Sequence, residues 1–229
     1  MFDLQNDKNL CPTERNALRD FYYSTKGGEW TDSANWTDPY ISHCFWKGIS
    51  CTNDGAVTTL NLTNDGLSGT LSKSIANLSS LEILELSDND IKVSYCCYNH
   101  FFTWMQALLT LTSCNTLTPP CLYTQGPIPA EIGPLFHLRI LRLSYNSFIG
   151  NVPTELVNLD NLELFQIHSN RISGTVPHIT LKKVPAESDF DPISSFIADC
   201  GNPSDFEESL DCTECTMCCK SRVLLFSSP

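Results

Sequence analysis

Apolar residues recur at a fixed interval along residues 57–92 and 126–182. Four segments begin at Val57, Leu81, Leu138 and Leu162, and they align at a period of 24 once residues 93–125 are left out. Within each segment apolar residues alternate over a few positions, as Leu84 and Leu86 do, which predicts a short strand with one apolar side. Because one such strand cannot bury that side alone, the segments are expected to stack over a continuous core.

Polar and turn-forming residues occupy columns of their own in this alignment. Each predicted strand is followed by a side chain that can satisfy backbone groups leaving the sheet, giving a ladder of Asp65, Asn89, Asn146 and Asn170. Glycines follow where a turn has no room for a Cβ atom, at Gly69, Gly150 and Gly174. Prolines then favour an extended return path, at Pro129, Pro153 and Pro177.

The complete pattern reads L-x-x-L-x-L-x-x-N-x-L-x-G-x-(I/V)-P-x-x-(L/I)-x-x-L. It resembles the plant-type leucine-rich-repeat family over roughly residues 12–219. The resemblance implies an α/β fold, a right-handed solenoid of about four 24-residue repeats. Its concave face would carry a short parallel sheet, and its convex face turns and extended segments. It also implies a binding scaffold similar to receptor ectodomains and wall-enzyme inhibitor proteins.

Residues 12–56 are expected to cap the front of the solenoid, because an open end would expose core. Thr13 is placed to N-cap a helix, and Gly27-Gly28 to end it. Its apolar stripe would be Ala17, Leu18, Phe21 and Tyr22, and the core beside it Trp30, Trp36 and Trp46. The run from His43 resembles the family's cap signature C-x-W-x-G-(V/I)-x-C, and by that resemblance Cys44 pairs with Cys51.

Residues 183–219 are expected to form an acidic, cysteine-rich C-terminal cap. Its cysteines are Cys200, Cys212, Cys215, Cys218 and Cys219. Disulfides are the favoured interpretation, with pairings that sequence cannot assign. We therefore expect no metal and no cofactor. The alternative is a zinc site formed by Cys212, Cys215 and Cys218, with Cys200 as the fourth ligand. Residues 1–11 and 220–229 are expected to be disordered.

An uncharged stretch, residues 93–125, interrupts the second segment, and removing it restores the 24-residue period. Three interpretations are open for these 33 residues. One is an island loop, whose closure costs only about 3 kcal/mol plus a constant. A membrane hairpin is disfavoured by its polar residues. The third, which we favour, is a translated intron, since Val93-Ser94 and Gln125 permit splice-donor and splice-acceptor codons.

The cysteine content indicates the cellular compartment of the protein, and the net charge limits the kinds of partner it can bind. Twelve cysteines are unusual for a reduced cytosolic chain, and three glycosylation sequons occur, at Asn35, Asn61 and Asn77. An extracellular or cell-surface protein is therefore expected. The start is not a signal peptide and no run is long enough to span a membrane, so a targeting or anchor segment is expected outside this chain. The net charge of −12 disfavours nucleic acid.

Residues 186–214 hold nine of the acidic groups and no lysine or arginine, which predicts a solvated, partly disordered stretch. Phosphate-binding, hydrolase and kinase motifs are absent from the sequence, so an enzyme is not expected.

The candidate ligand surface is instead the concave face. There the outward positions include Asn61, Thr63, Glu85, Ser87, Arg142, Ser144, Tyr145, Gln166 and His168. Tyr145 and His168 are the favoured partner residues. Glu85 is expected beside Arg142, and Arg139 between Glu82 and Glu163. The predicted function is recognition of a protein, peptide or glycan. The alternative is a structural or adhesive extracellular protein without a dedicated small ligand.

Overall fold

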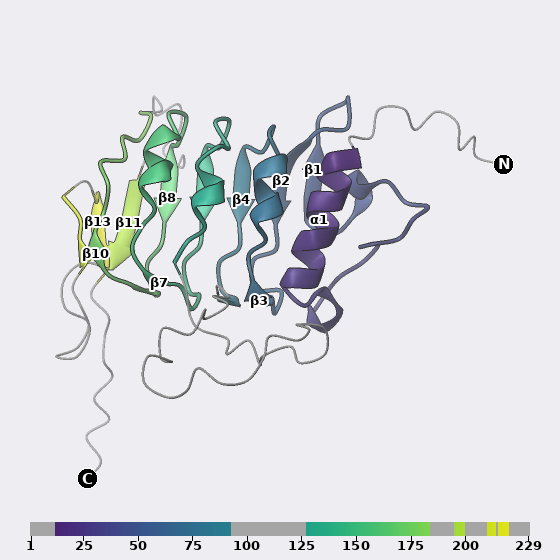
Figure 1. Cartoon of the computed structure of the whole chain (residues 1–229), viewed down its shortest axis with the longest axis horizontal. Helices are drawn as coiled ribbons and strands as arrows, with labels where there is room; N and C mark the ends of the chain where they lie inside the picture. The colour runs from purple at the N-terminus through teal and green to yellow at the C-terminus, as the bar shows by residue number, and fades with distance from the viewer. Residues whose placement is uncertain (1–11, 93–126, 184–194, 200–209, 214, 220–229) are drawn as a thin grey trace, which may run out of the picture.

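In the computed structural model, the described residues are 12–92, 127–183, 195–199, 210–213 and 215–219. Figure 1 shows the strands of one long sheet side by side, in a row that starts next to helix α1. Apart from the antiparallel pair β1–β2, neighbouring strands are parallel. In spatial order the strands are β1 (Ile49–Cys51), β2 (Val57–Asn61), β4 (Ile83–Glu85), β6 (Ile140–Arg142), β8 (Leu164–Gln166), β11 (Ser195–Asp199) and β13 (Met217–Cys219).

Equivalent positions of the aligned segments pair across this sheet. Ile83 pairs with Thr59 on one side and with Ile140 on the other, and Ile140 pairs with Leu164. The predicted apolar columns are buried, since the inward residues of the four strands are fully covered: Leu60, Leu84, Leu141 and Phe165. The pairing of β4 with β6 is the register obtained by leaving out residues 93–125, which themselves lie outside the described residues.

Short parallel strand pairs and single turns of 3-10 helix make up the rest of each repeat. The pairs join β3 (Ser68–Thr70) to β5 (Asp90–Lys92), β7 (Ile149–Gly150) to β9 (Arg171–Ile172), and β10 (Gly174–Thr175) to β12 (Leu210–Asp211). The 3-10 helices here are η3 (Lys73–Asn77), η4 (Ala130–Ile132) and η5 (Thr154–Asn158). In Figure 1 the labelled β3 and β7 lie below the strands of the main sheet, while the helical turns lie in front of it. The expected return path is only partly extended. Pro129 and Pro153 are extended N-cap residues, and a 3-10 turn follows each, because a fixed proline φ suits a helix start.

The asparagine side chains of the ladder form hydrogen bonds with the backbone groups that leave the sheet where the strands end. Nδ2 of Asn146 donates to the carbonyls of Leu86 and Leu143, at 2.9 and 3.2 Å, and its Oδ1 accepts from the Ile91 N–H at 3.1 Å. Asn89 and Asn170 donate to carbonyl groups in the same way. Each asparagine thus bonds to its own turn and to the preceding strand, which holds adjacent segments together.

The N-terminal cap has the expected helix with different ends. Helix α1 (Pro12–Ser24) begins before Thr13, so that residue lies in the first turn and is not the N-cap. The helix also ends before Gly27, and Lys26 adopts the left-handed conformation at φ 55°. Gly27 is needed for space instead, since a Cβ atom there would lie 2.0 Å from the Tyr22 ring. The 3-10 turns η1 (Gly27–Glu29) and η2 (His43–Phe45) complete the cap.

Three tryptophans fill the space between α1 and the first strands, as predicted. Trp30, Trp36 and Trp46 are buried, with ring centroids 4.9 Å apart for the first pair and 5.1 Å for the second. A disulfide joins Cys44 to Cys51, the pairing that the resemblance implied, with Cα atoms 5.6 Å apart. These contacts fix the cap loops against the first repeat.

The described residues of the predicted C-terminal cap add strands to the fold. Strand β11 extends the main sheet next to β8, because its alternating Phe196 and Ala198 are fully buried. Cys212 and Cys215 form a disulfide, which removes two of the four thiolates that the zinc alternative requires. Cys200, residues 1–11 and residues 220–229 lie outside the described residues.

Candidate binding surface

The side chains on the concave face form rows that cross the strands. In the middle row Asn61, Glu85 and Arg142 are linked, because Glu85 accepts from Nδ2 of Asn61 and from NH1 of Arg142, both at 2.5 Å. Gln166 is the next residue of the row, by its pairing with Arg142. The predicted contact between Glu85 and Arg142 is therefore confirmed. Since the charges are paired within the sheet, this row presents little unpaired charge to a partner.

A second charged row crosses the beginnings of the strands. Arg139 bonds Glu163 through its Nε and NH2 atoms, at 2.9 and 3.0 Å, and its NH1 lies 3.7 Å from Glu82. The predicted alternation of Glu82, Arg139 and Glu163 is confirmed. Arg139 and Glu82 are about half exposed, at 48% and 44%, so we expect these pairs to fix strand register more than they add stability.

Two predicted binding residues are buried. Ser87 and Ser144 are 8% and 2% exposed, so neither can offer the outward contact expected of it. Both lie two residues beyond a strand end, where the chain leaves the sheet. Ser144 Oγ lies 2.9 Å from Nδ1 of His168, which makes Ser144 a support for that ring. Thr63, in the same column, is exposed as expected.

The following column has a left-handed backbone in all four segments. The φ angles are 53° at Asn64, 58° at Asp88, 53° at Tyr145 and 57° at Ser169. Asparagine and aspartate tolerate this conformation, whereas a bulky side chain pays roughly 1–2 kcal/mol of steric cost for it. Tyr145 and Ser169 lack that tolerance, and Tyr145, the bulkier of the two, is also 53% exposed.

Tyr145 and His168 form an aromatic pair on this face. Their ring centroids are 5.2 Å apart and the planes meet at 81°, an edge-to-face contact. Burial lowers the pKa of His168, while the charges of Asp199 and Asp88 oppose that shift. Burial likewise raises the pKa of Asp199, which accepts a hydrogen bond from the Asn170 N–H at 3.3 Å. The site thus combines an exposed phenol ring, a half-buried imidazole and two nearby carboxyl groups.

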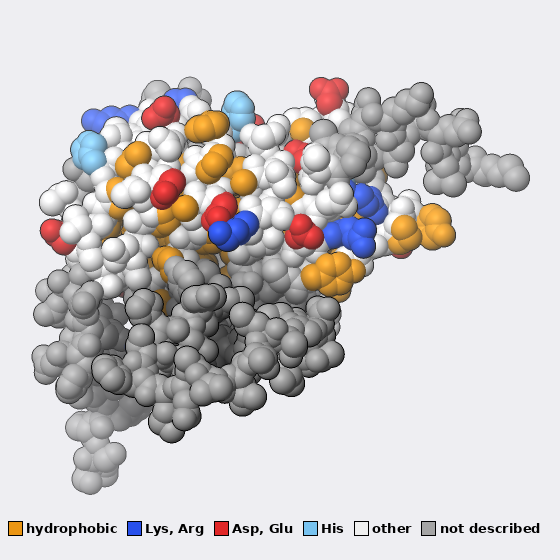
Figure 2. Space-filling view, viewed as in Figure 1, with side chains coloured by type: hydrophobic (Ala, Val, Ile, Leu, Met, Phe, Trp, Pro, Cys, Tyr) orange, Lys and Arg blue, Asp and Glu red, His pale blue; other side chains and the backbone are white. Residues whose placement is uncertain are grey.

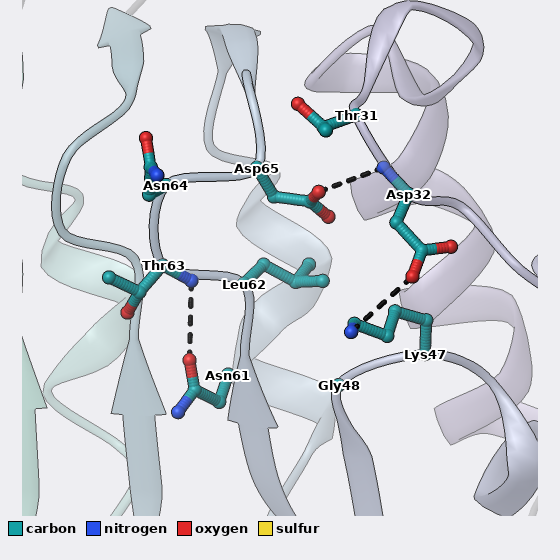
Figure 3. A pocket seen from close by; sticks show the side chains of 9 residues that line it. All are labelled: Thr31, Asp32, Lys47, Gly48, Asn61, Leu62, Thr63, Asn64 and Asp65. Carbon is teal, nitrogen blue, oxygen red and sulfur yellow. Dashed lines mark hydrogen bonds and ion pairs between the residues drawn. The ribbon is translucent and has the colours of Figure 1, made fainter.

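A pocket of about 570 Å³ opens at the front of the concave face, where the cap meets the first repeat (Figure 3). We call it the front pocket, and its lining residues are Thr31, Asp32, Lys47, Gly48, Asn61, Leu62, Thr63, Asn64 and Asp65. The repeat alignment identified Asn61, Thr63 and Asp65 but not the cap residues. No sequence signal assigned Asp32 or Lys47 to this place, because they lie on irregular loops outside the repeated columns.

The three sequon asparagines are exposed, and two of them already donate hydrogen bonds. Nδ2 of Asn35 donates to the Phe45 carbonyl at 2.9 Å, and Nδ2 of Asn61 donates to Glu85. Asn77 lies at the end of η3, opposite the sheet.

Figure 2 shows acidic and basic side chains interspersed on the side that carries the 3-10 helices. That surface has no field of a single sign to attract a highly charged partner.

The stacked strands, the asparagine ladder and the alternating apolar columns define a leucine-rich-repeat solenoid. The Leucine Rich Repeat family profile matches residues 137–159. Phytosulfokine receptor 1 of Arabidopsis thaliana is 33% identical over 201 residues, which cover 76% of this chain and 19% of that receptor. The chain is a leucine-rich-repeat protein of the plant type, similar to plant receptor-like proteins.

Solved structures agree on the fold. The crystal structure of PEPR1 with AtPEP1 superposes with a TM-score of 0.50 at 25% identity, covering 71% of this chain and 19% of that one. The ectodomain of the Arabidopsis receptor kinase HAESA, in complex with an extended IDA peptide hormone, gives a TM-score of 0.53 at 19% identity. That match covers 86% of this chain and 25% of the ectodomain, and it shows the fold alone.

The matching part of this chain spans 15–25% of the length of the first curated relatives. These matches lie within the leucine-rich-repeat part of the receptor kinases among them. Within the described residues, no helix is long and apolar enough to cross a membrane.

Proposed function

We propose that this chain is a non-catalytic extracellular recognition scaffold, part of a receptor-like protein, that binds a peptide or protein segment on its concave face around Tyr145 and His168. The observation that carries this proposal is the strained, exposed Tyr145. The repeat imposes the left-handed backbone at this position, so the feature that calls for a functional explanation is the choice of a bulky, exposed aromatic residue there. Exposed aromatic side chains also contribute much of the energy at protein interfaces.

The neighbourhood of Tyr145 supports a peptide more than a glycan. The phenol and imidazole rings are in edge-to-face contact, and Ser144 is within hydrogen-bonding distance of the imidazole, so the pair is preorganised for a partner. Glu163 and Glu85 are already paired with arginines within the sheet, whereas the carboxyl groups of Asp88 and Asp199 lie near His168. A peptide with few acidic residues fits such a face. The similar structure of PEPR1 is a complex with AtPEP1, which is consistent with this ligand class.

An extracellular location is part of the proposal. The two disulfides among the described residues would be reduced in a cytosol. The second candidate function is a structural or adhesive extracellular protein. The observation that favours this second function is that the charged side chains of the sheet are paired with one another, which leaves fewer of them to bind a ligand.

An array of synthetic peptides probed with the whole chain tests the proposal. We expect specific peptides to bind the wild type and to lose at least about tenfold in affinity with Tyr145→Asn, since a central aromatic anchor is worth 2 kcal/mol or more. Tyr23→Asn is the matched control, because Tyr23 is 62% exposed on α1, away from the sheet. Peptides that bind Tyr145→Asn as well as wild type, or an array without binders, would contradict the proposal and favour the structural alternative.

A further inference from the structure

The front pocket contains a buried carboxylate oxygen that the chain itself does not satisfy. Oδ1 of Asp65 accepts the Asp32 N–H at 2.9 Å, whereas Oδ2 has no hydrogen-bond partner among the described residues. Asp65 is only 7% exposed. Figure 3 shows its carboxylate directed from the end of β2 toward the Asp32 loop, across the pocket. An unpaired carboxylate oxygen at this depth is costly, so a donor from outside the chain would be bound favourably.

The charged side chains that line the pocket are two carboxylates and one ammonium group. Asp32 and Asp65 each supply a carboxylate, and Lys47 is the one cation among the lining residues. Nζ of Lys47 lies 3.3 Å from Oδ2 of Asp32, but both side chains are about half exposed, at 51% and 48%. Such a pair is weak and easily exchanged. The pocket therefore favours a compact cation that carries several N–H donors.

The backbone holds these groups in place. The Thr31 N–H donates to the Asp65 carbonyl at 2.8 Å, which ties the cap loop to the end of β2. Gly48 permits the other cap loop to approach, since a Cβ atom there would lie 2.2 Å from the Asn61 carbonyl oxygen. Asn61 in turn accepts the Thr63 N–H at 3.2 Å. The carboxylates are thus presented by a fixed frame, which lowers the entropic cost of binding.

We propose that the front pocket binds a primary ammonium group, the amino terminus of a peptide, between the carboxylates of Asp32 and Asp65. The ammonium displaces Lys47 from Asp32 and donates to Oδ2 of Asp65. Burial raises the pKa of Asp65, with a further contribution from the charge of Asp32, and an added cation would lower that pKa again. A metal ion fits less well. Among the described residues, the group of three side chains spaced for a metal is His43, Cys44 and Cys51, outside this pocket.

The identity of the ligand as a peptide rests on the proposed function, but the ammonium site does not. The pocket lies at the front end of the sheet, beside β2, whereas Tyr145 follows β6 two strands further along. A peptide on the concave face could therefore place its amino terminus in the pocket and its side chains against Tyr145. Loss of either site would weaken that peptide without abolishing the other contact.

Titration of the whole chain with small amines, followed by amide chemical shifts, tests the pocket alone. The probes are glycinamide, N-acetylglycinamide, which lacks the ammonium, and N-acetyllysinamide, which carries only a side-chain ammonium. We expect saturable shifts at the amides of Asp32, Thr63 and Asp65 with glycinamide and none with N-acetylglycinamide. Comparable shifts with N-acetyllysinamide would show that a lysine side chain serves as well as an amino terminus.

Three variants make the test specific. Asp65→Asn keeps the acceptor for the Asp32 N–H and should weaken glycinamide binding about tenfold or more, because it removes a charged acceptor. Asp54→Asn removes one charge at the far turn of the β1–β2 hairpin and should change nothing. Lys47→Met removes the competing cation and should strengthen binding, which keeps the proposal testable if Asp65→Asn fails to fold. Equal binding of the acetylated probe, or no saturable shift with any amine, would overturn the proposal, whatever the outcome at Tyr145.

Discussion

Glu85 on β4 accepts a hydrogen bond from NH1 of Arg142 on β6, at 2.5 Å, although 57 residues separate them in the sequence. On the other side of Glu85, Asn61 donates to the same carboxylate from a position only 24 residues away. Removing the 33 residues of Val93–Gln125 makes the two separations equal. The contact therefore joins neighbouring repeats, and the solenoid register does not depend on the intervening stretch.

Deleting Val93–Gln125, so that Lys92 is followed by Gly126, should leave the fold intact. We expect the free energy of unfolding in urea to stay the same or rise, by up to about 3 kcal/mol, because a long loop no longer has to be closed. The matched control replaces the stretch by a glycine-serine linker of equal length, which should behave like the starting chain. An unfolded deletion variant, or a clearly destabilised linker variant, would show that the stretch contributes contacts of its own.

The origin of that stretch has a separate test. The translated-intron hypothesis predicts a mature transcript in which the codon for Lys92 is joined to the codon for Gly126. Sequencing complementary DNA across this junction decides the matter. A transcript that retains the 33 codons would rule out the splicing hypothesis and leave an island loop as the better explanation.

Asn146→Ala should cost at least about 2 kcal/mol of stability, since it leaves several buried backbone groups without partners. The side chain bonds the Leu86 and Leu143 carbonyls and the Ile91 N–H, so its loss affects two repeats at once. Asn158→Ala, at the exposed end of η5, should change stability by less than about 0.5 kcal/mol. Chemical denaturation of both variants measures the difference, and similar losses would refute the ladder's role.

His168 should make stability depend on pH in a defined direction. Burial lowers the pKa of His168 below its ordinary value of 6.5, so the unfolded chain takes up the proton first as the pH falls. Stability from this group is present above pH 6.5 and is lost as the pH falls toward the lowered pKa. His168→Gln should remove the part of the pH dependence of stability that comes from this imidazole. Thermal unfolding of both proteins across this window measures it, and parallel curves would contradict the assignment.

Tyr145→Asn should stabilise the chain while it weakens binding. Asparagine tolerates the left-handed backbone, so about 1 kcal/mol of strain should be relieved, less the contact with the His168 ring. Tyr145→Phe keeps the ring and the strain, so its stability should match the wild type. If Tyr145→Asn is destabilised by more than about 1 kcal/mol, the ring is a packing element and the functional interpretation of the strain fails.

The sequence predicted those features that depend on one column of the repeat. The inward leucines, the asparagine ladder and the partners of Glu85 and Arg139 follow from alternation and a fixed period, because each residue's environment repeats. Ser87 and Ser144 were placed wrongly because burial just after a strand end depends on how the chain bends. The front pocket was missed because Asp32 and Lys47 belong to cap loops, which have no period and are brought to Asp65 only by tertiary packing.

The most direct test of the central claim is hydrogen–deuterium exchange of the whole chain with and without the strongest peptide from the array. If the concave face is the binding surface, amides of β4, β6 and β8 and of the turn that contains Tyr145 should exchange more slowly in the complex. Amides of η3, η4 and η5, on the opposite side, should not change. Protection confined to that opposite side, or to the cap helix α1, would contradict the account.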